Sequence, residues 1–167
     1  MCSLSDITDK NSGVDIGMIF EPWDTPFNEG TLSIISVVWG GDEWRVSYSS
    51  GKSYHFQMPA RARALLTVTL FHLESESVFE LKFLSASAFR LLDEGGLLHI
   101  WSERQINHNC FKVKGHPWSI ESPVTFAMGS DNGYSFFITT DDDCVEVVCR
   151  YPPEIVFLQK LQPKTPQ

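Results

Sequence analysis

The sequence lacks the cysteine spacings that bind zinc or build a disulfide framework. Its four cysteines, Cys2, Cys110, Cys144 and Cys149, include no C-x-x-C pair. Cys144 and Cys149 are five residues apart in an expected strand, which puts them on opposite faces and makes a bond between them geometrically poor. We therefore expect free thiols, no metal site and a reducing, cytoplasmic environment.

Long apolar runs are missing too. The longest one, residues 34–39, is far shorter than the roughly 20 residues needed to cross a bilayer. Residues 1–12 are polar and lack the apolar segment of a secretory signal. These observations predict no transmembrane helix, no membrane partner and a cytoplasmic location.

Positive charge is scarce, with 13 Lys and Arg against 21 Asp and Glu and a net charge of −8. Residues 1–60 hold three of the basic residues and eight of the acidic ones. Such a surface repels nucleic-acid phosphates and anionic lipids and attracts a basic protein. The alternative interpretation is that the charge serves only solubility.

Recognised catalytic and cofactor motifs are absent. The chain has no H-E-x-x-H, G-x-S-x-G, G-x-G-x-x-G or Walker sequence. Residues 141–143 are three aspartates, but an EF-hand needs a central glycine and a closing glutamate, so we interpret them as a hairpin tip. His72 lies in a mostly apolar segment and is expected to be a hydrogen-bonded core histidine. We predict no catalytic residue, no metal and no cofactor.

What the chain does contain is a series of short alternating segments typical of strands. The central pair is residues 65–73 and 78–84, joined by a polar turn at 74–77. Apolar residues on both faces of 65–73 predict a strand covered on both sides, and residues 31–39 suggest another. Further strands are expected at residues 14–21, 43–48, 53–58, 110–113, 125–128, 134–139, 144–150 and 155–158. The Asn132-Gly133 pair predicts a tight hairpin turn.

One convincing helix is expected in the middle of the chain. Ser85 is a plausible N-cap, Ala88, Phe89 and Leu92 share a helical face, and Gly95 suits a helix end. Residues 97–101 predict a second short helical segment, with a strand at 98–101 as the alternative. The fold class is thus α+β: about nine strands, mainly antiparallel, as two packed sheets or an open barrel. Residues 1–167 are expected to form one domain with loose ends at 1–12 and 159–167.

Acidic loops near the N-terminus are the expected contact surface for a basic protein. Trp23 lies between acidic residues in a Pro-rich loop, where a ring has less reason to be buried, and aromatic anchors beside carboxylates suit such an interface. The alternative is that Trp23 folds over a sheet edge. The predicted partner-binding residues are Glu21, Trp23, Asp24, Asp42 and Glu43.

Two segments, AFRLLDEGGLLHIWSE and SFFITTDDDCVEVVCRYPPEI, resemble parts of small acidic bacterial toxin-immunity proteins. The resemblance covers about a quarter of the chain and involves no functional motif. It implies a cytoplasmic, non-enzymatic protein that binds and blocks a secreted toxin, often a basic nuclease.

Two alternatives remain open at this point. One is a small-molecule binder with an apolar pocket lined by phenylalanine and tryptophan. The other is a hydrolase, which requires a cleft where His116 or His99 reaches an acid.

Overall fold

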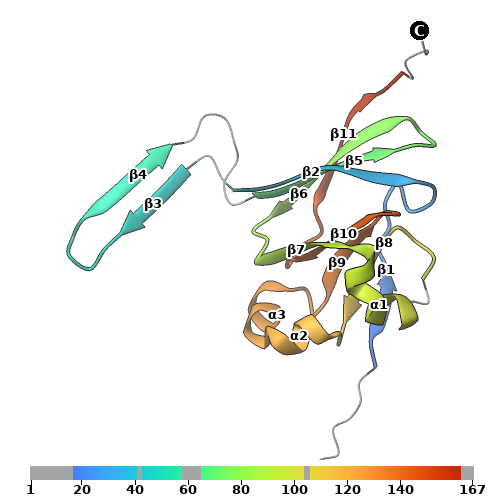
Figure 1. Cartoon of the computed structure of the whole chain (residues 1–167). Helices are drawn as coiled ribbons and strands as arrows, with labels where there is room; N and C mark the ends of the chain where they lie inside the picture. The colour runs from blue at the N-terminus through green and yellow to red at the C-terminus, as the bar shows by residue number, and fades with distance from the viewer. Residues whose placement is uncertain (1–16, 41–42, 58–64, 104–105, 163–167) are drawn as a thin grey trace, which may run out of the picture.

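The computed structural model describes residues 17–40, 43–57, 65–103 and 106–162. Within these ranges the chain forms eleven strands in three antiparallel sheets, with three short α-helices and one 3-10 turn (Figure 1). The predicted α+β class with a mainly antiparallel sheet is therefore confirmed. The strands form separate open sheets and do not continue around one barrel. Of the two predicted arrangements, the packed sheets are found and the open barrel is not. None of the helices in the described ranges is long and apolar enough to cross a membrane.

The larger sheet has five strands, all antiparallel to their neighbours. Their order is β1 (Ile19–Pro22), β8 (Cys110–Lys114), β9 (Ser135–Thr139), β10 (Asp143–Val148) and β7 (Ala88–Asp93). Asp141 and Asp142 lie where predicted, at the turn between β9 and β10, and Asp143 begins β10.

The second sheet has four strands in the order β11 (Glu154–Lys160), β6 (Ser77–Leu84), β5 (Leu65–His72) and β2 (Leu32–Gly40). The predicted central pair is confirmed, since β5 and β6 pair from Leu65↔Leu84 to His72↔Ser77. Two burial predictions are wrong. The outer face of β5, with Thr67, Thr69 and Phe71, is only partly buried, and β2 is an edge strand with Ile35 and Trp39 exposed. Both faces are apolar in sequence, but only one has a layer packed against it.

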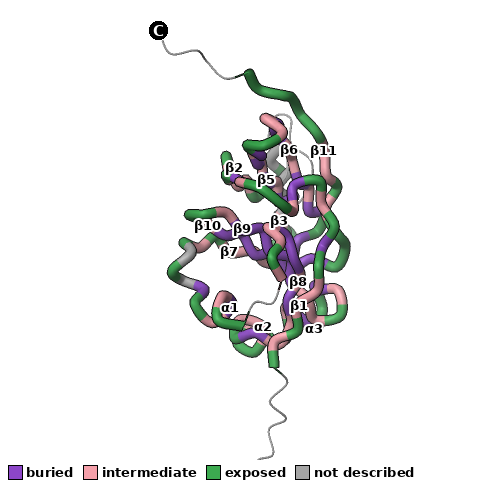
Figure 2. The backbone as a smooth tube through the Cα atoms, turned by 90° about the vertical axis from the view of Figure 1, so that its right-hand side faces the viewer, coloured by how far each residue is buried: buried purple, intermediate pink, exposed green. Residues whose placement is uncertain are grey.

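The main core lies between the two sheets (Figure 2). Leu66, Val68 and Leu70 of β5 pack towards residues of β9 and β10 in one buried cluster. At its centre the Trp23 ring contacts Phe136 and Phe83 edge-on, with centroids 5.0 and 6.3 Å apart. Burial of these side chains is the main term favouring the folded state.

Three helices form a third layer on the other face of the five-stranded sheet (Figure 1). They are α1 (Leu98–Glu103), which follows the 3-10 turn η1 (Glu94–Leu97), α2 (Pro117–Glu121) and α3 (Pro123–Gly129). Leu97 and Ile100 pack on Phe111, Val113 and Phe137 in a second buried cluster. The five-stranded sheet is therefore covered on both faces.

The predicted helix after Ser85 is wrong, because residues 88–93 form strand β7. This segment pairs with β10 from Val148↔Ala88 to Asp143↔Asp93, and Ser85 has φ +63° rather than the extended conformation of an N-cap. A short apolar run is compatible with the period of a helix and with that of a strand. Here the segment forms a strand because it pairs with the open edge of β10. The second predicted helical segment, at residues 97–101, is confirmed by η1 and α1, so the strand alternative is wrong.

A second error concerns residues 125–128, which were expected to be a strand and lie in helix α3. Pro117 and Pro123 occupy the first turns of α2 and α3, where a missing amide hydrogen costs nothing. The tight turn at Asn132-Gly133 is present, with φ +52° and +84°. It connects α3 to β9, not two long strands.

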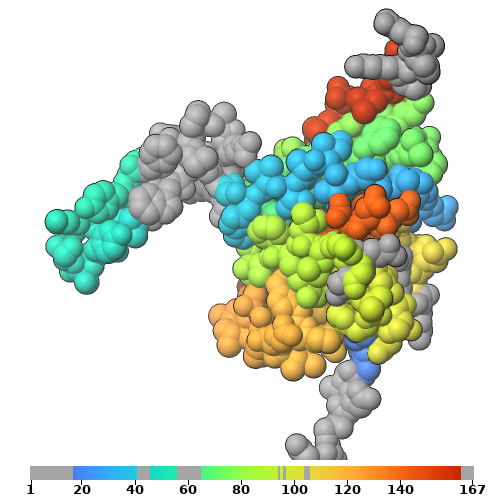
Figure 3. Space-filling view, in the orientation of Figure 1, coloured from blue at the N-terminus to red at the C-terminus, as the bar shows by residue number. Residues whose placement is uncertain are grey.

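The predicted strands at 43–48 and 53–58 form a separate hairpin of β3 (Glu43–Ser47) and β4 (Ser53–Gln57). These strands pair with each other and with no other described strand. The space-filling view shows the hairpin standing clear of the two larger sheets (Figure 3). At the other end of the chain β11 includes Gln159 and Lys160, so the chain stays in the sheet beyond residue 158. The N-terminal stretch 1–12 lies outside the described residues.

Two neighbouring residues of β6 test the sandwich core. Phe83 is fully buried whereas Leu84 is 57% exposed. We expect Phe83→Ala to lower the free energy of unfolding by about 3–5 kcal/mol through lost burial and a cavity, and Leu84→Ala to change it by less than about 0.5 kcal/mol. Urea denaturation followed by circular dichroism measures both. Similar costs for the two variants would contradict the assigned faces of β6.

Candidate functional site

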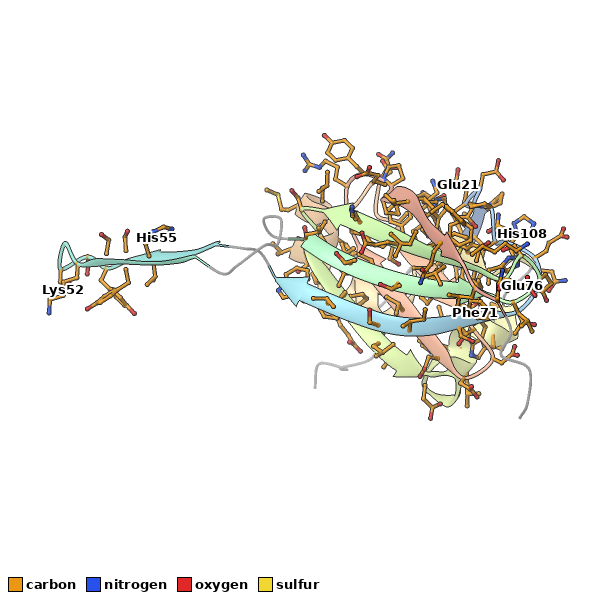
Figure 4. The ribbon with its side chains drawn as sticks, turned by 90° about the horizontal axis from the view of Figure 1, so that it is seen from above. Glu21, Lys52, His55, Phe71, Glu76 and His108 are labelled. Carbon is orange, nitrogen blue, oxygen red and sulfur yellow. The ribbon has the colours of Figure 1, made fainter. Side chains whose placement is uncertain are left out.

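An acidic pocket lies at the end of the sandwich formed by the loop between β1 and β2. Its cavity measures about 590 Å³ and is lined by three carboxylates, Asp24, Glu29 and Glu74, and two imidazoles, His72 and His108. No lysine or arginine is among the lining residues that the structure describes. The three acidic residues are exposed to solvent. Seen from above, Glu21, His108 and Glu76 lie at this end, opposite the β3–β4 hairpin that carries Lys52 and His55 (Figure 4).

Two buried aromatic rings fix the loop that carries Asp24 and Glu29. Trp23 and Phe27 are 8% and 0% exposed and belong to the core between the sheets. Asn28 caps the turn between them, since its Nδ2 donates to the Trp23 carbonyl at 2.9 Å. Asn109 then holds the loop from outside, donating to the carbonyls of Phe27 and Gly30 at 3.1 and 2.9 Å. The loop is polar in sequence, but the burial of its two aromatic rings holds it in place.

Glu74 joins the β5–β6 turn to the same loop. The backbone amide of Thr31 donates to both of its carboxylate oxygens, at 2.9 and 2.8 Å. This hydrogen bond lowers the pKa of Glu74 below its ordinary value of 4.5, because it stabilises the charged form. The pocket therefore keeps this negative charge at neutral pH.

His72 occupies the floor of the pocket as a hydrogen-bonded core histidine, as predicted. Its Nε2 lies 2.8 Å from the carbonyl oxygen of Glu29, which can only accept, so Nε2 carries the hydrogen. Its Nδ1 lies 2.8 Å from the Ser75 hydroxyl, which donates to it when the ring is neutral. Nε2 is also 3.1 Å from Glu74. Both ring nitrogens are engaged in holding the loop, which leaves neither for proton transfer.

The structure brings together two of the five predicted partner-binding residues. Asp24 lines the pocket, and Glu21 lies at the same end on β1, where it forms an ion pair with Lys112 at 2.8 Å. Glu43 begins β3 in the separate hairpin, and Asp42 lies outside the described residues. The prediction of Trp23 as an exposed anchor is wrong. Its ring is large and apolar and is buried between the sheets. The alternative was right that the ring is buried but placed it over a sheet edge.

Glu29, Glu74, His72 and His108 were not predicted as members of this site. Glu74 is distant in sequence from the loop, and it comes close because β2 and β5 pair with Leu32 opposite His72. That register places the residues before β2 beside the residues after β5. A sequence pattern that predicts two strands does not predict their register, so no signal identified Glu74.

A second cluster of ionisable side chains is buried between the five-stranded sheet and the helices. Glu146 of β10 is fully buried and accepts from Arg90 Nε and from the Ser135 hydroxyl, each at 2.5 Å. His116, at the start of α2, is also fully buried, with Nε2 2.6 Å from Glu146 Oε1. The indole of Trp118 covers Arg90, whose guanidinium carbon is 4.6 Å from the ring centroid.

The His116–Glu146 pair has the composition of a catalytic dyad but not its access. A base needs one ring nitrogen held by the acid and the other directed at a substrate. His116 Nδ1 has no hydrogen-bond partner among the residues that the structure describes, yet the ring is enclosed edge-on by Phe126 and Phe137 at 5.4 and 6.1 Å. The acid that the hydrolase alternative required is present. The cleft that it also required does not reach this pair, because both side chains have no exposed surface.

His99 of α1 lies beside this cluster. Burial lowers its pKa from the ordinary value of 6.5, and the positive charge of Arg90 lowers it further. Its Nε2 is buried without a hydrogen-bond partner in the described part of the chain, so the neutral ring is the form that suits the folded state. Within the described ranges, no group of three or more His, Cys, Asp or Glu residues could hold a metal ion.

Gly30 sets the shape of the acidic pocket, and a matched glycine tests this role. Gly30 has φ +89°, and a Cβ there would clash with the Glu74 carboxylate and lie 2.9 Å from His72 Nε2. Gly133 has a similar φ of +84° but nothing within 4 Å of an added Cβ. Gly30→Ala should cost about 1–3 kcal/mol more than Gly133→Ala in unfolding free energy, because strain is common to both and the clash is not. Gly30→Ala should also speed hydrogen exchange at the Thr31 amide, because the clash displaces the Glu74 carboxylate to which this amide donates. An unchanged exchange rate at Thr31 would contradict the role assigned to Gly30.

Protonation of His99 should make stability depend on pH. Since the pKa of His99 is lower in the folded state, the unfolded state binds more protons as pH falls below about 6.5, and the folded state loses stability there. The His99→Gln variant should show a smaller drop in urea midpoint between pH 7.5 and pH 5.5 than the wild-type protein. His55→Gln, in the exposed hairpin, is the control for removing a histidine. The window lies above the range in which Glu74 titrates.

The comparisons with known proteins add no relative from which a function could be transferred. No protein-family model, curated protein or solved structure matches this chain.

Proposed function

We propose that this protein is a non-enzymatic binding domain of the inhibitor or immunity type, which acts in the cytoplasm by binding a protein with a basic surface. The observation that carries the proposal is the acidic pocket, where Asp24, Glu29 and Glu74 line one cavity and no described lining residue is a lysine or arginine. A lysine or arginine of a partner would supply the missing opposite charge.

The geometry of the pocket supports a preformed contact surface. Trp23 and Phe27 anchor the loop in the core, and Thr31 holds the Glu74 carboxylate in place. A site fixed before binding loses less conformational freedom when the partner arrives. The carboxylates also remain partly exposed, which lets them attract a positive partner over a distance before contact.

Two features weigh against the alternative functions. The His116–Glu146 pair is closed off by the helices, which disfavours the hydrolase. The acidic pocket is lined by carboxylates and imidazoles, not by the phenylalanines and tryptophans expected of an apolar ligand site. Those aromatic side chains fill the core between the sheets instead.

The experiment compares two charge-reversed variants for capture of a partner and for the rate of its association. Asp24→Lys with Glu29→Lys alters the pocket, and Glu121→Lys with Glu154→Lys makes the same change in net charge at exposed positions elsewhere. A partner is first isolated from the native host on the wild-type protein. Its association rate is then measured by surface plasmon resonance across salt concentrations.

The pocket variant should associate at least about tenfold more slowly than the control variant at low salt, and the gap should narrow as salt rises. Equal rates for the two variants would remove the pocket from the interface. A captured partner with an acidic contact surface, or turnover of a substrate that depends on His116, would overturn the proposed function.

A further inference from the structure

Strand β7 forms an open edge of the five-stranded sheet. It pairs with β10 on one side, and no described strand pairs with its other side. All six of its residues are in register with β10, from Ala88↔Val148 to Asp93↔Asp143. The space-filling view shows the yellow-green segment that includes β7 on the surface, directly below β2 (Figure 3). A regular edge strand of this kind carries a row of unpaired amide and carbonyl groups to which another strand can add.

The other three edges of the two larger sheets carry features that hinder such addition. β1 has four residues and ends in Pro22, which lacks an amide hydrogen. The register of β2 shifts between Ile34 and Ser36, and that of β11 shifts between Phe157 and Gln159. Short strands, proline and bulges are the means by which proteins protect sheet edges. Of these four edges, β7 is therefore the one that suits an added strand.

The side chains along β7 indicate what an added strand contacts. Phe89, Leu91 and Asp93 alternate onto the face towards the four-stranded sheet, where Phe89 packs against the main core. Leu91 is 49% exposed, and Trp39 remains 48% exposed although it stacks on Phe89. Residues directly opposite each other in neighbouring strands share a face and contact each other. An apolar residue of the added strand therefore suits the position beside Leu91, and the residue two positions away lies beside Asp93.

Negative charge gathers at the end of β7 that carries Asp93. The register places Asp93 directly opposite Asp143 of β10, and like charges in this position destabilise a sheet. Neither carboxylate forms an ion pair with a described residue. Asp141 and Asp142 add two exposed carboxylates in the adjoining turn. A lysine or arginine beside Asp93 would relieve the repulsion, so charge complementarity selects a basic residue for that position.

This end of β7 lies at the same end of the sandwich as the acidic pocket. Thr139, the last residue of β9 before the acidic turn, donates its amide to the Asn109 carbonyl at 2.9 Å. The Asn109 side chain in turn donates to the carbonyl of Gly30, a lining residue of the pocket, at 2.9 Å. A basic protein that contacts the pocket therefore has the acidic end of β7 on the neighbouring surface.

We infer that the open edge of β7 is a docking site for an extended segment of a basic protein, which adds to the five-stranded sheet as a further strand. The segment has an apolar residue beside Leu91 and a lysine or arginine two positions away, beside Asp93. In this mode of binding, main-chain hydrogen bonds supply affinity and alternate side chains supply specificity. The docking site rests on the proposed function, because it assigns a second contact to the same basic partner.

A second copy of the chain suits this edge poorly. Two copies joined through β7 would bring together two molecules with a net charge of −8 each, which repel each other. The basic side chain that β7 itself offers is Arg90, and Arg90 is already paired with Glu146. A second β7 therefore has no free positive charge to place beside Asp93.

The experiment titrates a synthetic peptide of two Thr-Val-Thr-Lys repeats into the isotope-labelled full chain and follows its backbone amides by NMR. Valine and lysine two positions apart share a face of an extended peptide, as the positions beside Leu91 and Asp93 require. We expect shifts centred on residues 88–93 and slower hydrogen exchange there. The same peptide with every internal backbone nitrogen methylated keeps its charge but loses its hydrogen-bond donors, so it should bind at least about tenfold more weakly.

Two charge-neutralised variants test the chemistry of the edge. Asp93→Asn with Asp143→Asn should weaken binding of the unmethylated peptide about three- to tenfold, through the loss of exposed ion pairs. Glu121→Gln with Glu154→Gln makes the same change in net charge at exposed positions elsewhere, and should leave the affinity within about twofold of the wild-type value. The NMR spectrum of each variant shows whether it is folded.

Four outcomes would overturn the docking site. They are absence of peptide binding, equal binding of the methylated and unmethylated peptides, equal affinities of the two charge-neutralised variants, and protection of β7 that rises with protein concentration without peptide. The last result would identify a second copy as the occupant.

The pocket is separated from the edge by a third variant, Asp24→Asn with Glu29→Gln. Shifts centred on the pocket that disappear in this variant would overturn the docking site and leave the proposed function in place. Equal association rates of the charge-reversed pocket variant and its control with the native partner would instead remove the pocket from the interface, whatever the peptide does. The failure of the docking site and the failure of the proposed function are therefore distinguishable.

Discussion

The packing of one tryptophan between two sheets is the interaction on which the candidate site depends. Trp23 contributes its ring to the main core, against Phe83 of one sheet and Phe136 of the other. The next residue, Asp24, is exposed and lines the acidic pocket. Burial of the ring thus determines where the carboxylate lies. An acidic loop, which has no apolar stripe of its own, gains a fixed shape from the residues on either side of its charges.

The buried cluster around Glu146 places a different demand on the fold. A carboxylate without exposed surface is costly unless it is paired and hydrogen-bonded. Arg90 and Ser135 supply these contacts from β7 and β9, and Trp118 of α2 covers the arginine. One charged group therefore ties together two neighbouring strands and the helical layer. We regard this arrangement as structural, because the layers that satisfy the charge also shut out a substrate.

The sequence predicted most of the strands, but it was much less informative about their pairing and about which side chains are buried. Alternation predicted β5, β6, β9 and β10, and the polar turns between them, because each has a face in contact with a core. The same alternation cannot separate an edge strand from a short helix, and residues 88–93 became β7 only because the edge of β10 was open to them. Local composition was also a poor guide to burial. Trp23 lies in an acidic loop and is buried, whereas Trp39 lies in an apolar run and is 48% exposed. Of the candidate site, Asp24 and Glu21 could be predicted from local composition, but Glu74 and His72 depend on strand register, which is a property of the assembled sheet.

The exposed side of β2 carries one further consequence. β2 and β7 are edge strands of different sheets, and Trp39 stacks on Phe89 across them with centroids 5.2 Å apart. The register of β2 also shifts between Ile34 and Ser36. A bulged edge strand is a poorer template for a foreign strand than a regular one. The bulge in β2 therefore disfavours the addition of a foreign strand at this edge of the four-stranded sheet, from which the chain continues into the hairpin.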